Sequence, residues 1–212
     1  LVADARTITE LLAERYPDTP VFLAGESMGG AVVLLAQAGE PDLPVAGSVL
    51  LAPAVWDRGH MPWYQRLGLW LASRVAPRAT VSGGGMDIQP SDNTEMLREL
   101  ARDPLVQSGA RIGTLDGVTD LMDRAQSVVP EHTGRTLILY GENDAIIPRD
   151  PMCQLFQRLP EAADWRAALY ADGYHMLTRD LQGDVVRRDI GDWLLDPTGP
   201  LASGETANLD GR

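Results

Sequence analysis

The sequence contains no lysine, and all 18 of its basic residues are arginine. This absence excludes chemistry that depends on a lysine amine, such as a Schiff base or a phosphate-binding loop with its lysine. Basic residues are also few beside the 30 acidic ones, which leaves a formal net charge of -12. A nucleic-acid-binding surface is disfavoured, because such surfaces gain most of their affinity by neutralising phosphates. Electrostatic docking on an anionic membrane is disfavoured for the same reason.

Cysteine and long apolar runs are scarce as well. The single cysteine, Cys153, cannot form a disulfide within the chain, which fits a reducing compartment, and we expect it to be a small core residue. No apolar run reaches the length of about 18 residues that a transmembrane helix needs. No combination of histidine, cysteine and carboxylate has the spacing of a metal site. We therefore predict a cytoplasmic protein without a resident metal or cofactor.

What the sequence does contain is the pattern of an α/β protein. Its 212 residues are 44% hydrophobic and 23% charged, which suffices for one well-buried core. Helical periodicity predicts an opening helix over 1–16 and a closing helix over 183–195. Short apolar runs bounded by turn residues predict four buried strands, at 21–24, 45–55, 136–140 and 165–170. Because helical stretches separate these strands, we expect them to pair in parallel.

Residues 56–133 differ from the rest, since they have helical patterns and no convincing strand. One apolar stripe lies at helical spacing and consists of Trp63, Leu67, Trp70, Leu71 and Val75. Asp92 and Glu95 resemble a capping box that opens the next helix, and residues 111–128 predict a third helix. The glycines at 83–85 favour a simple loop over a phosphate loop, because no lysine follows them and no strand precedes them.

This contrast predicts how the chain is divided. We expect a discontinuous core of residues 1–55 and 134–196, an inserted helical cap of residues 56–133, and a disordered tail of residues 197–212. Large side chains of the cap would either line a pocket for an acyl chain or pack its helices together, and they are Met61, Trp63, Tyr64, Trp70, Met86, Met96 and Met122. The sequence leaves both interpretations open.

The segment Gly25-Glu26-Ser27-Met28-Gly29 has the pattern G-x-S-x-G and lies between a predicted strand and a predicted helix. A serine on so sharp a turn has a strained backbone, and the two glycines avoid clashes that a Cβ atom would make. Its hydroxyl projects above the sheet, while the N–H of Met28 faces a developing oxyanion. The pattern alone arises by chance in roughly one chain in ten, but its strand-to-helix setting is far less common. The alternative is a close-packed turn with Ser27 as a helix cap.

A nucleophilic serine needs a histidine as base and an acid that orients the histidine. His175 follows the last predicted strand, whereas His60 and His132 lie in or beside the insertion. Asp144 follows the third predicted strand, and catalytic groups of open α/β sheets gather at such strand ends. The rival acids near these positions are Glu142, Asp150 and Asp172. The resulting order, Ser27 then Asp144 then His175, is the order found in α/β hydrolases.

Three segments, GESMGGA, GENDAIIP and GYHMLTRD, resemble the elbow, acid and histidine segments of a known family. It comprises monoacylglycerol lipases and lysophospholipase-like α/β hydrolases, also grouped as the serine aminopeptidase S33 type. A fourth segment, SDNTEMLRELARDPLV, is similar to the cap segment of bacterial members, and the likeness runs from residue 1 to about 196. The resemblance implies that Ser27 is the nucleophile, Asp144 the acid and His175 the base. It further implies that Met28 supplies one oxyanion donor through its N–H, and that the inserted helices form a lid over an acyl pocket.

The chain departs from the family pattern at its start. Members carry several strands and a His-Gly oxyanion loop ahead of the elbow, whereas the 26 residues before Ser27 contain no His-Gly pair. A missing second oxyanion donor typically lowers the rate by ~10²–10³. The strand before Ser27 would also become an apolar sheet edge. Because these strands and an initiator Met are missing, we expect an N-terminally truncated hydrolase, and the likeness of its cap segment implies a bacterial one.

These observations predict a serine hydrolase that cleaves carboxylic esters of the acyl-glycerol or lysophospholipid type through an acyl-enzyme intermediate. Its partner would be a small lipid or ester, with no cofactor and no nucleic acid, and the cap would touch lipid interfaces transiently. One alternative is a catalytically impaired fragment or a chain that only binds ligands. Another is an acyltransferase or an exopeptidase that uses the same three residues.

Overall fold

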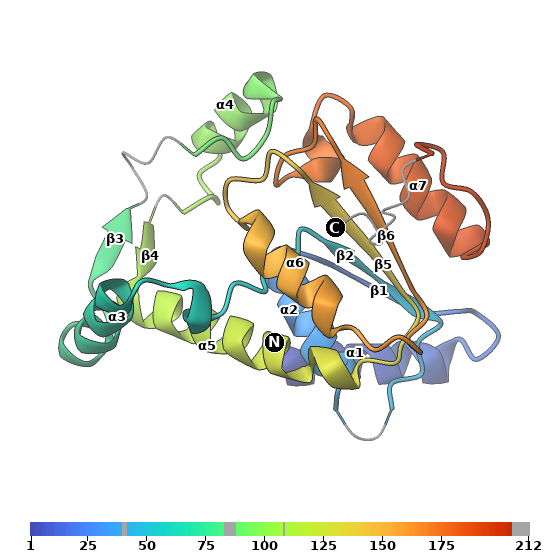
Figure 1. The fold of residues 1–212 in the computed structure, drawn as a ribbon, viewed down its shortest axis with the longest axis horizontal. Helices are drawn as coiled ribbons and strands as arrows, with labels where there is room; N and C mark the ends of the chain where they lie inside the picture. Colours follow the sequence, from blue (N-terminus) through green and yellow to red (C-terminus); the bar gives the residue numbers. More distant parts are fainter. Residues whose placement is uncertain (40–41, 83–87, 108, 205–212) are drawn as a thin grey trace.

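A four-stranded parallel sheet forms the centre of the structure, a computed structural model that describes residues 1–39, 42–82, 88–107 and 109–204. Its strands stand in the order β1-β2-β5-β6 (Figure 1) and comprise Phe22–Glu26, Gly47–Leu51, Thr136–Gly141 and Trp165–Tyr170. Each strand overlaps one of the four predicted runs, and the predicted parallel pairing is confirmed. In register, Glu26 lies opposite Leu51 and Leu51 opposite Leu139, so the carboxyl ends of these strands lie side by side at one end of the sheet.

Helices cover both faces of this sheet. On one face lie α2 (Met28–Gln37), α5 (Ile112–Val128) and α6 (Arg149–Arg158), whose apolar side chains surround Leu50 and Ile138. On the other face α7 (Gly183–Leu195) packs on Val49, Leu137 and their neighbours (Figure 1). The alternation of side chains along β2 and β5 therefore fills two separate apolar clusters, as expected for strands that are covered on both sides.

Strand β1 is one edge of the described sheet and β6 is the other, and β1 was expected there because no strand run precedes it in the sequence. All five residues of β2 are buried, whereas β1 is only half-buried and its Ala24 is exposed. Helix α1 (Val2–Arg15) packs against α2, but Thr9 is its only buried residue. Its apolar side chains Ile8 and Leu11 are 57% and 54% exposed. The amphipathic pattern therefore formed a helix whose apolar face lies largely in solvent.

The insertion contains a short antiparallel pair of strands, contrary to the prediction that it has none. Strands β3 (Thr80–Ser82) and β4 (Gly109–Arg111) pair residue by residue, and Ile112 N–H donates to the carbonyl of Ala79 beyond them. Strands of three residues have too few side chains to show a two-residue period, so the sequence offered no signal. The predicted loop at 83–85 lies outside the described residues, and so does Met86.

The remaining helices of the insertion are α3 (Trp63–Val75), α4 (Thr94–Arg102) and α5, with the 3₁₀ turns Arg58–His60 and Val129–Glu131 at either end. The predicted capping box is displaced by one residue, because Asn93 and not Asp92 caps α4. The side-chain oxygen of Asn93 accepts a hydrogen bond from Met96 N at 3.1 Å. The carboxylate of Asp92 instead accepts from Leu181 N at 2.8 Å. The side chain of Asp92, which local spacing assigned to the start of α4, therefore binds the backbone of a loop distant in the sequence.

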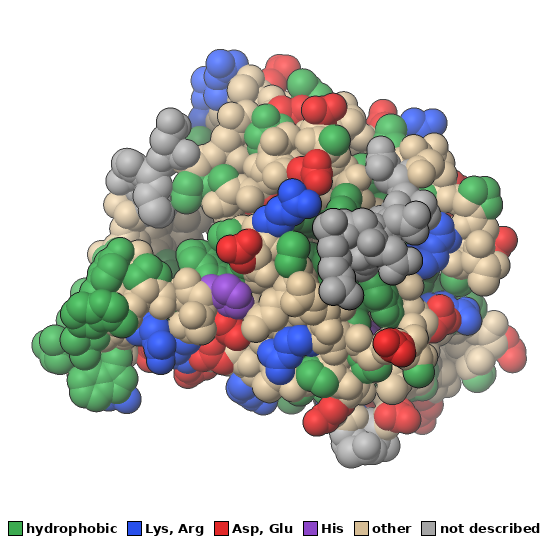
Figure 2. All heavy atoms as spheres, viewed as in Figure 1, with side chains coloured by type: hydrophobic (Ala, Val, Ile, Leu, Met, Phe, Trp, Pro, Cys, Tyr) green, Lys and Arg blue, Asp and Glu red, His purple; other side chains and the backbone are tan. Residues whose placement is uncertain are grey.

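The apolar stripe on α3 forms the predicted helix but faces solvent. Trp63 is 74% exposed and Trp70 is 51% exposed, and Leu67, Leu71 and Val75 are exposed as well. Figure 2 shows these hydrophobic side chains gathered over α3. In contrast, Met61, Met96 and Met122 are half-buried. Packing of the insertion therefore uses these three methionines, while Trp63 and Trp70 belong to an open apolar surface that we call the α3 face (Trp63, Leu67, Trp70, Leu71, Val75).

Helix α5 connects the start of the insertion with the core that covers the sheet. The guanidinium of Arg58, at the start of the insertion, forms ion pairs with three carboxylates of α5, those of Asp116 (2.9 Å), Asp120 (2.6 Å) and Asp123. Burial disfavours the charged form of Arg58, but the carboxylates of Asp120 and Asp123 outweigh it and raise the pKa of Arg58. At its other end, Ala125 is fully buried in the cluster beneath α2. The second half of α5 is thus part of the core, although it precedes residue 134.

Two further expectations differ from the structure. Cys153, expected in the core, is exposed on α6. Within the predicted tail, Leu201 is 5% exposed and packs in the α7 cluster, while Arg166 Nη1 donates to the carbonyl of Gly199 at 2.6 Å. Residues 205–212 lie outside the described part of the chain. A single leucine among polar residues shows no periodicity, which explains why the sequence did not predict this packing.

Candidate active site

Ser27 occupies the turn between β1 and α2, and its backbone is strained. Its φ of 53° and ψ of -118° are uncommon for a residue with a Cβ atom. Its own N–H donates to Leu51 O at 2.9 Å, and its carbonyl accepts from Ala54 N at 2.8 Å. These bonds to the end of β2 hold the turn in place. A serine kept in a strained conformation at a strand end is what the pattern G-x-S-x-G predicts.

Two glycines make this turn possible, but only one is a glycine of the pattern. A Cβ atom at position 25 would lie 2.3 Å from the carbonyl oxygen of Gly29, and one at position 30 would lie 2.6 Å from Cβ of Pro53. A Cβ atom at position 29 would meet nothing within 4 Å. The steric role that the sequence assigned to Gly29 therefore belongs to Gly30, because α2 passes close to the end of β2.

Alanine substitutions should separate these three glycines. We expect Gly25→Ala and Gly30→Ala each to lower the free energy of unfolding by about 2 kcal/mol, because backbone or proline atoms must move. Gly29→Ala is expected to raise it by about 0.5 kcal/mol through the better helix propensity of alanine. Urea unfolding of the three variants measures this order. Equal midpoints for Gly25→Ala and Gly29→Ala would contradict it.

Asp144 and His175 are brought together by the loops that follow β5 and β6. Nδ1 of His175 lies 2.8 Å from Oδ2 of Asp144, and both side chains are buried. The second carboxylate oxygen, Oδ1, accepts from Ile146 N at 2.8 Å and Ile147 N at 2.9 Å. The turn after β5 thus fixes the carboxylate and leaves one oxygen for the histidine. Because Asp144 occupies Nδ1, Nε2 is the ring nitrogen left for a reacting group.

The rival acids do not take this position. Asp150 lies in the first turn of α6, Glu142 is exposed, and Asp172 lines a surface hollow described below. The buried Tyr140 hydroxyl donates to the carbonyl of Ile147 at 2.8 Å and so braces the turn that carries Asp144. Burial, together with the negative charge of Asp144, raises the pKa of Tyr140 and keeps this hydroxyl protonated.

The other two histidines lie elsewhere. Nδ1 of His60 pairs with Oδ1 of Asp57 at 2.8 Å at the start of the insertion. His132 is buried below the sheet, with Nε2 2.7 Å from the hydroxyl of Thr136 at the amino end of β5. Catalytic groups gather at the opposite, carboxyl end of the strands, so His132 does not compete with His175. His60 is paired with Asp57 instead of an acid that follows β5. Within the described ranges, no three or more His, Cys, Asp or Glu side chains form a group that could hold a metal ion.

His132 predicts how stability responds to pH. Burial lowers the pKa of His132, only partly offset by a hydrogen bond with the backbone of Gly134, so the folded state disfavours its protonation. Below the unfolded value of about 6.5 the unfolded state binds more protons, and stability falls as pH falls. In His132→Gln we expect the slope of unfolding free energy between pH 6.5 and 5 to be shallower by up to about 1.4 kcal/mol per pH unit. Denaturant unfolding at stepped pH tests this, and parallel slopes would rule it out.

The N–H of Met28 lies at the start of a helix. Met28 is the first residue of α2, and the first N–H groups of a helix have no partner within it. Such groups carry partial positive charge and favour an anion near them. The position therefore suits stabilisation of an oxyanion that forms beside Ser27.

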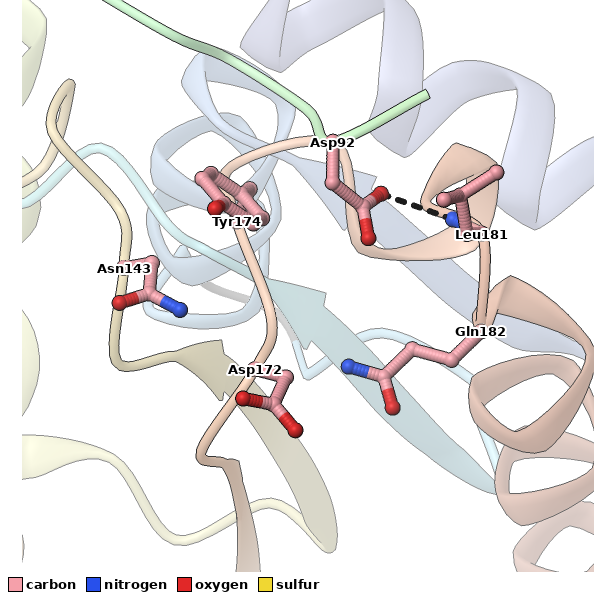
Figure 3. Close-up of a pocket in the computed structure, with 6 residues that line it drawn as sticks. All are labelled: Asp92, Asn143, Asp172, Tyr174, Leu181 and Gln182. Carbon is pink, nitrogen blue, oxygen red and sulfur yellow. Dashed lines mark hydrogen bonds between the residues drawn. The ribbon is translucent and has the colours of Figure 1, made fainter. Parts of the chain in front are cut away.

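A polar hollow of about 490 Å³ borders the loops that carry Asp144 and His175. Figure 3 shows the side chains around it, which are Asp92, Asn143, Asp172, Tyr174, Leu181 and Gln182. Carboxylates and amides predominate, so the hollow does not suit an acyl chain. A second hollow of about 520 Å³ is lined by three residues of the α3 face, Trp63, Leu67 and Trp70, together with Arg58 and Arg66.

Sequence reasoning missed the contacts that connect the insertion with the loop of His175. Ser91 is fully buried, and its hydroxyl donates to Asp180 Oδ1 at 2.6 Å. Both residues fall within segments that carried the family resemblance, but nothing in their spacing indicates that they meet. A side-chain contact across 89 residues is decided by tertiary structure.

Comparisons with known proteins identify the family to which the chain is similar. Residues 1–182 match the sequence model of a family described as serine aminopeptidase, S33. Human monoglyceride lipase is 26% identical over 182 residues, which are 85% of this chain and 59% of that protein. The chain thus spans less than two thirds of the length of this relative.

Solved structures give the same picture. The monoacylglycerol lipase of Paleococcus ferrophilus superposes with a TM-score of 0.74 at 26% identity, over 92% of this chain and 75% of that one. A soluble variant of monoglyceride lipase from Saccharomyces cerevisiae, solved with a substrate analog, also gives a TM-score of 0.74. Its identity is 19%, over 93% of this chain and 69% of that one, so this second likeness concerns the fold alone.

Proposed function

The chain belongs to the serine aminopeptidase S33 family, and from that premise we propose that it forms the catalytic site of a serine hydrolase. Its substrates would be carboxylic esters of the acyl-glycerol or lysophospholipid type. The chain has the α/β-hydrolase fold, as the sequence predicted. The observation that carries the proposal is the buried pair of His175 and Asp144, whose Nδ1 and Oδ2 atoms are 2.8 Å apart. The pair lies at the carboxyl end of the sheet, where the strained Ser27 also lies.

The proposed reaction begins with the ester carbonyl beside Ser27. Nε2 of His175 removes the hydroxyl proton while Oγ of Ser27 attacks the carbonyl carbon, and Asp144 stabilises the imidazolium that forms. The N–H of Met28 donates to the oxyanion of the tetrahedral intermediate. His175 then gives its proton to the leaving alcohol, which departs and leaves an acyl group on Ser27. Water, deprotonated by His175, attacks the acyl group, and His175 returns that proton to Oγ of Ser27 as the C–O bond to serine breaks and the fatty acid leaves.

A fluorophosphonate probe tests the nucleophile, because it reacts with activated serines only. We expect covalent labelling at Ser27 in the wild-type protein, mapped by mass spectrometry, and none in Ser27→Ala. A folded wild-type protein that remains unlabelled would refute the proposal and favour a chain that binds without catalysis. Lysophospholipids, monoacylglycerols, short esters and aminoacyl amides should then be compared as substrates. Cleavage of amides alone would instead indicate an exopeptidase, and transfer to an added alcohol an acyltransferase.

We also propose that the α3 face touches lipid interfaces transiently. Its apolar side chains are exposed, and the guanidinium of Arg74 lies over the ring of Trp70 at 4.2 Å. A helix with one apolar face and basic residues beside it suits the headgroup region of a membrane. None of the described helices is long and apolar enough to cross a membrane. We propose a location in the cytoplasm with such transient contact at the membrane surface.

Vesicle binding distinguishes this use of the α3 face from simple solvent exposure. Trp63→Ser and Trp70→Ser should each weaken partitioning onto phosphatidylcholine vesicles about tenfold, because each removes a large apolar group from the contact. Neutral lipid is chosen because the chain carries a net charge of -12. Leu195→Ser is the matched control, since Leu195 is 88% exposed but lies on α7. Equal binding of all variants in a sedimentation assay would argue against the α3 face.

A further inference from the structure

The two backbone amides that flank His175 are both held by hydrogen bonds. Tyr174 N donates to Asp180 Oδ2 at 2.8 Å, and Met176 N donates to the carbonyl of Pro90 at 2.9 Å. Asp180 follows His175 by a single turn, whereas Pro90 belongs to the insertion. The histidine thus sits between one anchor in its own loop and one in a segment far away in the sequence.

A buried hydroxyl connects these two anchors. Ser91, next to Pro90, donates through Oγ to Oδ1 of Asp180 at 2.6 Å. The carboxylate therefore accepts one bond from the insertion and one from the loop of His175. We call this arrangement the Ser91–Asp180 junction, which comprises Pro90, Ser91, Tyr174, Met176 and Asp180.

Burial makes the junction sensitive to loss of either partner. Ser91 is 0% exposed and Asp180 is 5% exposed. Burial raises the pKa of Asp180, and the hydrogen bonds from Ser91 and Tyr174 oppose that rise. A carboxylate deprived of one donor in such a place must rearrange or take up a proton, because an unsatisfied buried acceptor is unfavourable. The hydroxyl of Ser91 therefore acts on the same carboxylate that holds Tyr174.

Two neighbouring bonds extend the junction toward α4. Asn93 Nδ2 donates to the carbonyl of Arg179 at 3.0 Å, and Leu181 N donates to Asp92 Oδ1, as the dashed line in Figure 3 shows. Asn93 also caps α4 through its side-chain oxygen. A displacement of α4 would therefore also displace residues 179–181, which follow the loop of His175.

From these contacts we infer that Ser91 and Asp180 are positioning residues that hold His175 at the distance and angle that proton transfer from Ser27 requires. This inference rests on the proposed function, in which His175 is the base. The junction also joins the position of the insertion to the geometry of the catalytic histidine. A misplacement of about 1 Å in a reacting group lowers rates ~10²-fold, so a loose junction should act on kcat.

The chain offers a matched control in Asp189. This aspartate is also fully buried and accepts one hydroxyl, from Tyr170 at 2.6 Å, and one backbone N–H, from Ser203 at 2.8 Å. It lies on α7, and both of these donors lie outside the Ser91–Asp180 junction, Tyr170 at the end of β6 and Ser203 in the segment after α7. Asp189→Ala therefore reproduces the chemical loss of Asp180→Ala without the junction.

Steady-state kinetics of Ser91→Ala, Asp180→Ala, Asp180→Asn and Asp189→Ala test the inference with the ester that the wild-type protein hydrolyses best. We expect Ser91→Ala and Asp180→Ala to lower kcat about 10–100-fold with KM changed less than about threefold. Asp180→Asn keeps an oxygen for Tyr174 N and an amide facing Ser91 Oγ, and should recover most of the rate. Asp189→Ala should keep kcat within about twofold even where its melting temperature falls. Equal losses of kcat in Asp189→Ala and Asp180→Ala, or losses that lie in KM, would overturn the inference.

Hydrogen exchange separates this inference from the proposed function, because it requires no activity. In Ser91→Ala the amides of Tyr174 and Met176 should exchange at least about tenfold faster than in the wild type, whereas Asp189→Ala should leave them unchanged. Unaltered exchange in a folded Ser91→Ala protein would show that the junction does not hold the loop. If exchange rises but the wild type neither labels nor hydrolyses esters, the junction stands and the proposed function fails.

Discussion

Replacing Ser27 by glycine is expected to abolish ester hydrolysis and, at the same time, to stabilise the protein. The nucleophile is lost, which lowers kcat by about 10⁶-fold where serine, histidine and acid act as a unit. The residue also has a φ of 53°, which glycine adopts without strain. Relief of that strain outweighs the greater flexibility of glycine in the unfolded chain, so the free energy of unfolding should rise by about 0.5–1 kcal/mol. Urea unfolding and an ester assay measure both effects on one sample.

Ser27→Ala serves as the control for this double effect. It removes the same hydroxyl and should be equally inactive, but it keeps a Cβ atom in the strained conformation and should gain no stability. An inactive glycine variant that is less stable than the alanine variant would show that the turn is not strained in solution. An active glycine variant would place the nucleophile elsewhere in the chain.

Replacing Asp144 by asparagine is expected to lower kcat about 10⁴-fold with little change in KM. Asparagine has nearly the same shape, and its oxygen can still accept the N–H groups of Ile146 and Ile147. Its amide nitrogen would then face Nδ1 of His175, where it donates a hydrogen bond and favours the wrong tautomer of the ring. The imidazolium formed during the reaction would also lose a negative charge 2.8 Å away.

The rival acids supply the controls for this substitution. Asp150→Asn and Asp172→Asn change charge in the same region of the chain, and we expect each to keep kcat within about threefold. Circular dichroism of all three variants checks that the fold persists. A decrease in kcat for Asp172→Asn as large as that for Asp144→Asn would identify Asp172, which lines the polar hollow, as the catalytic acid.

Much of the sheet and of the candidate site could be predicted because the signals are local. A strand covered on both faces needs a short continuous apolar run, and the four runs became the four strands. The turn at Ser27 needs small residues at fixed spacing, and its strand-to-helix setting was visible in the sequence. Asp144 and His175 follow strands directly, and parallel strands end together. Their hydrogen bond was therefore expected from order alone.

Other features could not be predicted because their partners are distant in the sequence. Gly30 takes the steric role assigned to Gly29, since the clash it avoids is with Pro53 at the end of β2. The carboxylate of Asp92 accepts a hydrogen bond from Leu181 N instead of capping α4, and Asn93 is the N-cap of that helix. The apolar periodicity of α3 was correct, yet periodicity does not reveal whether a partner covers the face.

The sequence by itself determined the strands, their parallel pairing and the three residues proposed for catalysis, because strands that run in one direction place the residues that follow them at the same end of the sheet. Tertiary structure alone decided that Oδ1 of Asp144 is occupied by two backbone N–H groups, which leaves Oδ2 for His175. It also decided that a serine of the insertion secures the loop of the histidine through Asp180. Such contacts depend on the relative positions of folded elements, and no local pattern of side chains encodes them.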